Sequence, residues 1–101
     1  MLGIIPVWMV NKNMTLMTLD LSNNFCEGQI PCGSGASIDI INLSQNLLLG
    51  LFPSCLNLQY VSHVLLQGNK LTGSFPIAFL NSPGLVTLDI RDNSFLAAYL
   101  K

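Results

Sequence analysis

The chain has 101 residues, which is enough for one domain and no more. Half of its residues are apolar and only 9% are charged, whereas roughly a quarter are charged in typical soluble domains. The formal net charge of −1 gives no basic surface to match a phosphate backbone, so we expect no nucleic-acid partner.

The chain opens with the apolar segment MLGIIPVWMV, which Pro6 interrupts. This segment lacks a basic beginning and a cleavage site made of small residues, so we do not expect a signal peptide. No apolar run in the chain approaches the roughly 18 residues that a membrane helix needs. We therefore expect no membrane span within this chain.

Four units with a shared pattern follow, and consecutive units begin 22, 23 and 24 residues apart. Their first residues are Leu16, Ile38, Val61 and Leu85, and they read LMTLDLSNNFCEGQIP, IDIINLSQNLLLGLFP, VSHVLLQGNKLTGSFP and LVTLDIRDNSFLAAYL. Repetition at such a period is the signature of stacked-repeat proteins. We number the positions of each unit from 1 to 16. We expect one solenoid domain, 1–101, without capping domains; its parts are the tail of a preceding repeat (1–15), three repeats (16–37, 38–60 and 61–84) and an incomplete final repeat (85–101).

Apolar residues recur at positions 1, 4 and 6 of the units. Positions 4 and 6, such as Leu19 and Leu21, lie two residues apart, so in a strand both side chains point to one face. A single unit cannot bury this stripe, and neighbouring units must therefore stack and share a continuous core. We predict that each unit has a concave-face strand, a turn, a second extended piece, and a short helical or irregular return.

Three further positions carry residues suited to the turn and the second extended piece. Position 9 is always asparagine, whose amide can bond main-chain groups of its own and the adjacent unit. Position 13 is glycine in three units, which permits a conformation or approach that a Cβ would block. Position 16 is proline in the same units, which fits a strand end because proline has no N–H donor. The asparagines are Asn24, Asn46, Asn69 and Asn93; the glycines are Gly28, Gly50 and Gly73; the prolines are Pro31, Pro53 and Pro76.

The segment VLLQGNKLTGSFP, residues 64–76, admits a second interpretation. In isolation, its Gly68-Asn69 pair between two apolar runs is typical of a β-hairpin. The repeat argues against a hairpin, because Val64 falls on a core position of one strand and Asn69 on the turn that follows. We therefore predict that Leu71 returns to the core in a separate extended piece.

The pattern L-x-x-L-x-L-x-x-N-x-L-x-G-x-I-P resembles the plant-type leucine-rich repeat, and the G-x-I-P half is its plant-specific part. The resemblance covers essentially the whole chain and is greatest to the ectodomains of plant receptor-like proteins and receptor-like kinases. It implies an α/β repeat solenoid, a right-handed coil with a parallel β-sheet on the concave face. A second short strand in each repeat and 3-10 or irregular convex segments are implied as well.

The same resemblance implies a non-catalytic recognition module outside the cell or at the plasma membrane, within a longer receptor. Such a module is expected to bind a peptide or protein ligand in defence or developmental signalling, and to act with a co-receptor kinase. Two other functions are compatible with the repeat. One is an inhibitor of secreted pectin-degrading enzymes, and the other is a truncated remnant without a binding function.

The chain departs from the family pattern in three respects. Its cysteines lie within repeats rather than in capping segments, and Cys26 takes a position usually held by leucine, where we expect a buried thiol. The last unit has Ala97, Tyr99 and Leu100 in place of glycine, isoleucine and proline. The chain also begins within a unit, so we expect an interior piece of a longer receptor or a truncated gene product.

No cofactor, metal or catalytic residue is expected. The three cysteines and His63 do not have the spacing of a structural zinc site, and whether any of the cysteines pair is left open. His63 and Asp89 could suggest acid–base chemistry, but no nucleophile accompanies them. We therefore do not expect an enzyme.

The resemblance implies that a ligand meets the concave face at the outward positions 2, 3, 5, 7 and 8. We interpret Ser22 and Ser44, at position 7, as a solvated polar surface. Other outward residues could bind charged or amide groups of a partner. These candidates are His63, Gln67, Arg91, Asp92 and Gln45.

Two tripeptides match the sequon for N-linked glycosylation, Asn13-Met14-Thr15 and Asn42-Leu43-Ser44. We expect both asparagines at exposed points of the repeat, Asn13 in a return segment and Asn42 on the concave face. A sugar on Asn42 would cover that part of the face and displace any ligand site.

Overall fold

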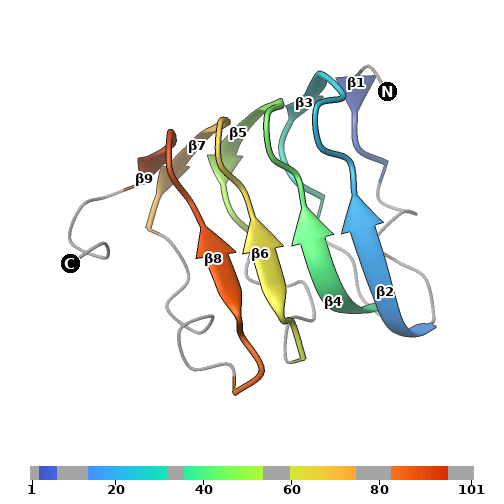
Figure 1. The fold of residues 1–101 in the computed structure, drawn as a ribbon. Coiled ribbons are helices and arrows are strands. Elements are labelled where there is room, and N and C mark those ends of the chain that lie inside the picture. The colour runs from blue at the N-terminus through green and yellow to red at the C-terminus, as the bar shows by residue number, and fades with distance from the viewer. Residues whose placement is uncertain (1–2, 7–13, 32–35, 54–59, 75–82, 96–101) are drawn as a thin grey trace.

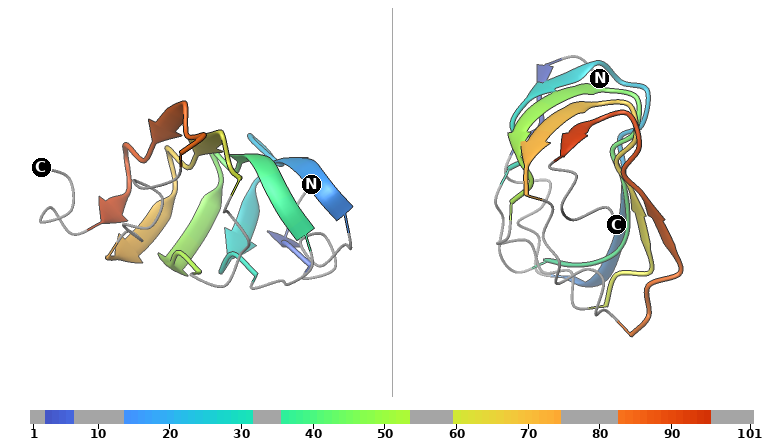
Figure 2. Two further views of the ribbon diagram at one scale, coloured as in Figure 1. Left: turned by 90° about the horizontal axis from the view of Figure 1, so that it is seen from below. Right: turned by 90° about the vertical axis from the view of Figure 1, so that its left-hand side faces the viewer.

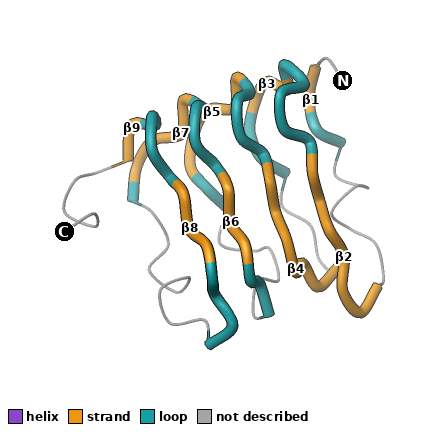
Figure 3. The backbone as a smooth tube through the Cα atoms, viewed as in Figure 1, coloured by secondary structure: helices purple, strands orange, loops and turns teal. Residues whose placement is uncertain are grey.

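The computed structural model describes residues 3–6, 14–31, 36–53, 60–74 and 83–95. These residues form strands and loops, and they contain no helix (Figure 3). The strands are β1 (Gly3–Ile4), β2 (Met14–Asp20), β3 (Cys26–Gly28), β4 (Ala36–Asn42), β5 (Leu47–Leu51), β6 (His63–Leu65), β7 (Lys70–Gly73), β8 (Thr87–Asp89) and β9 (Ser94–Phe95). Much of the predicted convex return, with Asn13, Cys32, Cys55 and Pro76, lies outside the described residues.

The strands form two parallel sheets, and each of the four units supplies one strand to each sheet. The four-stranded sheet has the order β2-β4-β6-β8, and the five-stranded sheet has the order β1-β3-β5-β7-β9 (Figure 1). Seen along the stack, the strands of each sheet lie behind one another and the chain bends between the two sheets (Figure 2). The predicted parallel sheet and the second short strand per repeat are confirmed, and the four-stranded sheet is the one expected on the concave face.

The hairpin interpretation of residues 64–76 is wrong. β6 and β7 flank the Gly68-Asn69 pair, but β6 belongs to the four-stranded sheet and β7 to the five-stranded sheet. Each strand pairs with the matching strand of the neighbouring units rather than with the other. The asparagine therefore ends one strand and allows the chain to turn towards the next sheet.

The two sheets differ in register. In the four-stranded sheet equal positions face each other from position 3 onward, as in the pairs Asn42–Leu65 and Leu65–Asp89, whereas the pairing of β2 with β4 shifts register before Thr18. In the five-stranded sheet position 13 of one unit faces position 11 of the next, as in the pair Gly50–Leu71. The second sheet is therefore staggered by two residues per unit, and because side chains alternate along a strand, the inward face stays inward.

The core lies between the two sheets and consists of positions 1, 4, 6, 11 and 15 of the units. The buried apolar residues are Ile5, Leu19, Cys26, Ile30, Ile38, Ile41, Leu43, Leu48, Phe52, Val61, Val64, Leu66, Leu71 and Phe95. Cys26 is 0% exposed, as the sequence predicts. Burial of each Leu, Ile or Val side chain contributes about 1.5–3 kcal/mol, so the stacking of units is the main source of stability. Leu88 and Ile90 of the fourth unit are only partly buried, because the described residues cover that unit on one side.

Asn46, at position 9 of the second unit, bonds main-chain groups of two units. Its Oδ1 accepts hydrogen bonds from the N–H of Asn24 at 3.1 Å and of Cys26 at 2.9 Å. Its Nδ2 donates to the carbonyl oxygen of Leu21 at 2.9 Å and of Leu43 at 3.0 Å. Asn46 is buried, so these bonds satisfy polar groups that water does not reach.

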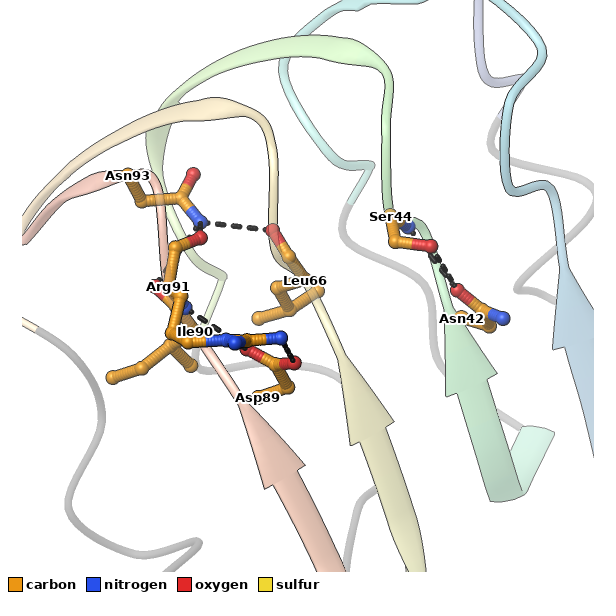
Figure 4. Close-up of polar contacts among 7 residues, drawn as sticks. All are labelled: Asn42, Ser44, Leu66, Asp89, Ile90, Arg91 and Asn93. Atoms are coloured by element: carbon orange, nitrogen blue, oxygen red, sulfur yellow. Dashed lines mark hydrogen bonds and ion pairs between the residues drawn. The ribbon is translucent and has the colours of Figure 1, made fainter.

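The next two units repeat this arrangement. Asn69 accepts a bond from the N–H of Leu48 at 3.1 Å and donates to the carbonyl of Leu43 at 2.8 Å. Asn93 donates to the carbonyl of Leu66 at 2.8 Å (Figure 4). In each case an asparagine bonds the unit that precedes it. The asparagines thus connect neighbouring units where the chain passes from one sheet to the other.

The glycines at position 13 meet two conditions at once. Gly28, Gly50 and Gly73 have φ angles of 78°, 82° and 76°, in the region that favours glycine. A Cβ on Gly50 would lie 3.3 Å from Cγ of Gln29, and a Cβ on Gly73 would collide with Leu51. The side chain at position 14 of one unit therefore lies over the glycine of the next unit.

Candidate functional site

The outward side chains of the four-stranded sheet form rows, because equal positions of neighbouring units face each other. Position 3 gives the row Thr18, Ile40, His63 and Thr87, and position 5 gives the row Asp20, Asn42, Leu65 and Asp89. A ligand that lies across the strands would meet one residue of each unit in turn. This face is the candidate binding surface.

His63 lies in β6 and is half-buried. Its partners in the row are Ile40 on one side and Thr87 on the other. The row therefore places neither a carboxylate nor a thiol directly beside the imidazole. His63 can offer a hydrogen bond to a ligand, but its neighbours in the row supply no partner for acid–base chemistry.

Beyond the strands, positions 5 and 7 are joined within a unit by hydrogen bonds. In the first unit, the N–H and the hydroxyl of Ser22 donate to Oδ1 of Asp20 at 3.1 and 2.8 Å. In the second unit, the N–H and the hydroxyl of Ser44 donate to Oδ1 of Asn42 at 3.2 and 2.7 Å (Figure 4). The side chain at position 5 thus accepts hydrogen bonds from the residue two positions further on, as Asp and Asn side chains commonly do in turns.

The interpretation of Ser44 as a solvated surface residue is wrong. Ser44 is only 6% exposed, and its hydroxyl is donated to Asn42 rather than to water. Ser22 is half-buried and makes the same bond to Asp20. The serine at position 7 therefore closes the turn after the strand and is not available to a ligand in these two units.

The fourth unit has a charged version of this turn. The N–H and Nε of Arg91 donate to Oδ1 of Asp89 at 3.1 and 2.9 Å, and Nη2 donates to Oδ2 at 2.8 Å (Figure 4). These hydrogen bonds hold the pKa of Asp89 below its usual value. The Arg91 side chain is 79% exposed, so a ligand can reach the guanidinium, but Asp89 already neutralises its charge.

The third unit differs, because position 5 is Leu65 and offers no oxygen. The N–H of Gln67 lacks the bond that the other three units give to position 7. The Oε1 atom of Gln67 is also buried and has no hydrogen-bond partner within the described part of the chain. A buried acceptor without a partner costs about 1–3 kcal/mol of stability, so this glutamine is held unfavourably.

Position 8 has a left-handed backbone in all four units. The φ angles of Asn23, Gln45, Gly68 and Asp92 are 58°, 57°, 76° and 57°. Only glycine adopts this conformation without strain, and asparagine tolerates it better than most residues. Gly68 is therefore the relaxed member of this row, and it is also the member without a side chain.

Gln45 occupies the space that a side chain on Gly68 would fill. A Cβ on Gly68 would lie 2.7 Å from both Cδ and Oε1 of Gln45 and 2.8 Å from its Nε2. The main-chain N–H of Gln45 also donates to the carbonyl of Gln67 at 2.8 Å. The structure thus brings Gln45 and Gln67 together across two units, with Gly68 between them.

Asn42, a sequon asparagine, is half-buried at the end of β4 rather than fully exposed as its sequence position predicts. Its Oδ1 accepts the two bonds from Ser44, and its Nδ2 donates no hydrogen bond within the described residues. The atom that would carry a sugar is therefore the unbonded one. The other sequon asparagine, Asn13, lies outside the described residues.

The five predicted ligand residues are thus placed in three different environments. Gln45 and Gln67 are neighbours, Arg91 and Asp92 are exposed in the next unit, and His63 lies within strand β6. From the sequence, Gln67-Gly68 is the outward pair where recognition by the third unit would begin, but sequence reasoning missed Leu65 as a determinant of this surface. A signal for Leu65 was present, because position 5 is Asp or Asn in the other three units.

Comparison with known proteins gives the same family as the repeat and the two parallel sheets. The Leucine Rich Repeat family model matches residues 15–35. The chain is 36% identical to Receptor-like protein 31 of Arabidopsis thaliana in an alignment of 77 residues that covers 71% of this chain. It is 33% identical to Receptor-like protein 43 of the same plant over 94 residues, which are 92% of this chain.

The chain belongs to the leucine-rich repeat family. Its repeats are of the type found in plant receptor-like proteins. The chain spans only 9% and 13% of the length of the two relatives. No helix in the described part of this leucine-rich repeat chain is long and apolar enough to cross a membrane.

Proposed function

We propose that this leucine-rich repeat chain is a non-catalytic recognition module, and that the outward face of its four-stranded sheet binds a peptide or protein ligand. The observation that carries the proposal is the register of that sheet, which aligns equal positions into rows of outward side chains. An extended ligand that crosses the strands follows such a row and meets one residue of each unit in turn. Both relatives are named receptor-like proteins, which supports a recognition role.

We propose that the module acts outside the cell, either in the apoplast or at the plasma membrane. The support is the similarity to receptor-like proteins, whose name implies that they perceive a signal. Defence or developmental signalling through a co-receptor kinase is the pathway that fits such a module. The rows of outward side chains supply the ligand contacts, and they require no cofactor.

The proposal can be tested by panning a phage-displayed peptide library against the secreted chain. The test variant is Arg91→Ala with Asp92→Ala, which removes one charge of each sign from the exposed end of the candidate surface. The matched control is Glu27→Ala with Lys70→Ala, which removes one charge of each sign from exposed positions of β3 and β7. Peptides selected on the parent chain should lose at least about tenfold in affinity for the test variant, which corresponds to 1.4 kcal/mol.

The control variant should bind the selected peptides as the parent chain does. Equal loss of affinity in both variants would place the binding surface elsewhere and would contradict the proposal. Unchanged affinity in the test variant would also contradict the assignment of the ligand to this end of the sheet. Circular dichroism and urea unfolding of both variants exclude loss of folding as the cause.

We also propose that Asn42 carries an N-linked glycan in the secreted protein; the sugar would cover the face at Asn42 itself and direct a peptide to the part of the surface that carries Gln67, Arg91 and Asp92. The support is the sequon and the unbonded Nδ2 of Asn42 at the end of β4. Tandem mass spectrometry of chymotryptic peptides from protein secreted by plant cells should show the sugar on Asn42, and Asn42→Gln should abolish that modified peptide. An unmodified Asn42 in the parent protein would exclude this proposal.

A further inference from the structure

Two glutamine residues on adjacent units, Gln45 and Gln67, lie next to each other just beyond strands β4 and β6. The N–H of Gln45 donates to the carbonyl oxygen of Gln67 at 2.8 Å, so the two main chains are in contact. Neither side-chain amide forms a hydrogen bond within the described residues. Two carboxamides, each able to donate and to accept, are therefore free of partners at one point of the candidate surface.

The amide of Gln45 lies flat against Gly68. The position that a Cβ on Gly68 would take is 2.7, 2.7 and 2.8 Å from Cδ, Oε1 and Nε2 of Gln45. An amide group is planar. A point about 2.7 Å from all three of these atoms therefore lies above the plane of the amide rather than beside its edge. The face of the amide therefore rests on the glycine, and its donor and acceptor groups point sideways.

The carboxamide of Gln67 makes no hydrogen bond within the described residues that would offset the cost of burying its oxygen. Its Oε1 is buried and has no partner within the described residues, and Leu65 cannot accept a bond from its N–H. The Gln67 side chain is unbranched and half-buried, so it can turn towards solvent. Because it makes no hydrogen bond in its present position, turning outward breaks none.

We infer that Gln45 and Gln67 form a subsite for an uncharged amide group of a bound peptide, either a main-chain amide or the side chain of Asn or Gln. The amide of the peptide donates its N–H to Oε1 of Gln67, and its carbonyl accepts from a glutamine Nε2. This inference deepens the proposed function and rests on it. A peptide carboxylate fits less well, because Asp89 already pairs with Arg91 and the described residues of the neighbouring unit contain no other cation.

The test uses three small probes of similar size on the full chain: propionamide, propionate and propylammonium. Each is titrated into protein labelled with nitrogen-15, and the signals of the main-chain N–H and side-chain amides of Gln45 and Gln67 are followed. Propionamide should shift these signals in a saturable manner, whereas the two charged probes should not. A preference for propionate or for propylammonium would overturn the inference.

Gln29 provides a matched control, because it is an exposed glutamine whose side chain lies over Gly50 in the five-stranded sheet. Gln67→Leu should weaken propionamide binding at least about tenfold, the effect of losing one hydrogen bond. Gln29→Leu should leave it unchanged. Gly68→Ala, which displaces the Gln45 amide, should weaken it as well. Unchanged binding in Gln67→Leu, or equal shifts of the Gln29 amide, would overturn the inference.

Failure of this inference differs from failure of the proposed function. Peptides that depend on Arg91 and Asp92 while propionamide does not bind at Gln67 would leave the recognition role intact and remove only the amide subsite. Propionamide binding at Gln67, with no peptide that depends on the outward face, would show the subsite and contradict the broader proposal.

Discussion

The two sheets of this solenoid are built from the same four units but present different surfaces. The four-stranded sheet is in register, so equal positions form rows, and its outward face is largely polar. The five-stranded sheet is staggered, and it exposes large apolar residues; these include Ile4, Phe25, Leu47, Leu49 and Leu51. The outward residues of the in-register sheet can therefore vary for recognition, whereas the side chains of the staggered sheet must fit against the next unit.

The largest effect should follow from breaking the junction between the two sheets. Asn46→Leu leaves the N–H groups of Asn24 and Cys26 without their acceptor, and two or more carbonyls without their donor. Each buried unsatisfied group costs about 1–3 kcal/mol, so the free energy of unfolding should fall by about 3 kcal/mol or more. Urea unfolding followed by circular dichroism measures the change.

Asn42→Ala is the control for this substitution. Asn42 lies on the four-stranded sheet, and within the described residues its side chain accepts bonds only from Ser44 of its own turn, so the loss of this side chain should cost less, about 1–2 kcal/mol. If both substitutions had equal effects, the junction asparagine would have no special role and the comparison of the two regions would fail.

The next effect concerns the staggered sheet. Gly73→Ala forces a non-glycine residue to a φ of 76° and drives a Cβ into Leu51, whereas Gly28→Ala at 78° meets only an ordinary contact of 3.4 Å with Ile4. In both variants the free energy of unfolding should fall by about 1 kcal/mol, because alanine is strained at a positive φ. Gly73→Ala should lose more because Leu51 must also move. Urea unfolding of the two variants measures the difference. The added Leu51→Ala substitution should bring Gly73→Ala close to Gly28→Ala, and failure to do so would place the extra loss elsewhere.

A smaller effect is expected at the buried thiol of the staggered sheet. Burial raises the pKa of Cys26 above its usual value of about 8.5, so its thiolate is disfavoured in the folded state. The folded state favours the protonated thiol of Cys26. The stability that this preference contributes is therefore complete below about pH 8.5 and is lost as the pH rises through the raised folded pKa of Cys26. Alkylation by iodoacetamide, mapped to Cys26 by peptide mass spectrometry, should be slow in native protein and fast in urea. Rapid native alkylation would contradict the buried position.

The smallest effect is expected on the outward face of the in-register sheet. Arg91→Met removes an exposed ion pair, so the free energy of unfolding should fall only slightly at neutral pH. The pKa of Asp89 is lowered in the folded protein, so the pair stabilises fully above about pH 4 and the effect disappears as the pH falls through the folded pKa. Unfolding at pH 7 and pH 2.5 measures this; a loss that persists at low pH would exclude the ion pair as its cause.

The repeat spacing was sufficient to predict the core. Ile41 and Leu43 of the second unit, and Val64 and Leu66 of the third, lie at positions 4 and 6 and are buried, as the two-residue period requires. Cys26 was assigned to the core from its position alone, because a small apolar thiol can take the place of leucine. These predictions succeeded because each depends only on the alternation of side chains within one strand.

The candidate surface could be predicted only in part. Positions 7 and 8 were identified as outward, but Ser44 proved to be buried by its bond to Asn42. The contact of Gln45 with Gly68 joins residues of two units, and no pattern within one unit indicates it. The unpartnered Oε1 of Gln67 depends on how neighbouring side chains cover it, which sequence spacing does not specify.

The sequence by itself determined the unit, its two extended pieces and the residues that face the core, because these follow from the period of apolar side chains and from the chemistry of asparagine, glycine and proline. Only the tertiary structure decided how each unit sits on the next. The register of one sheet, the two-residue stagger of the other and the meeting of Gln45 with Gln67 all arise from contacts between units. Such contacts depend on the packing of complete side chains against a neighbour, and this packing is a property of the stack rather than of any single repeat.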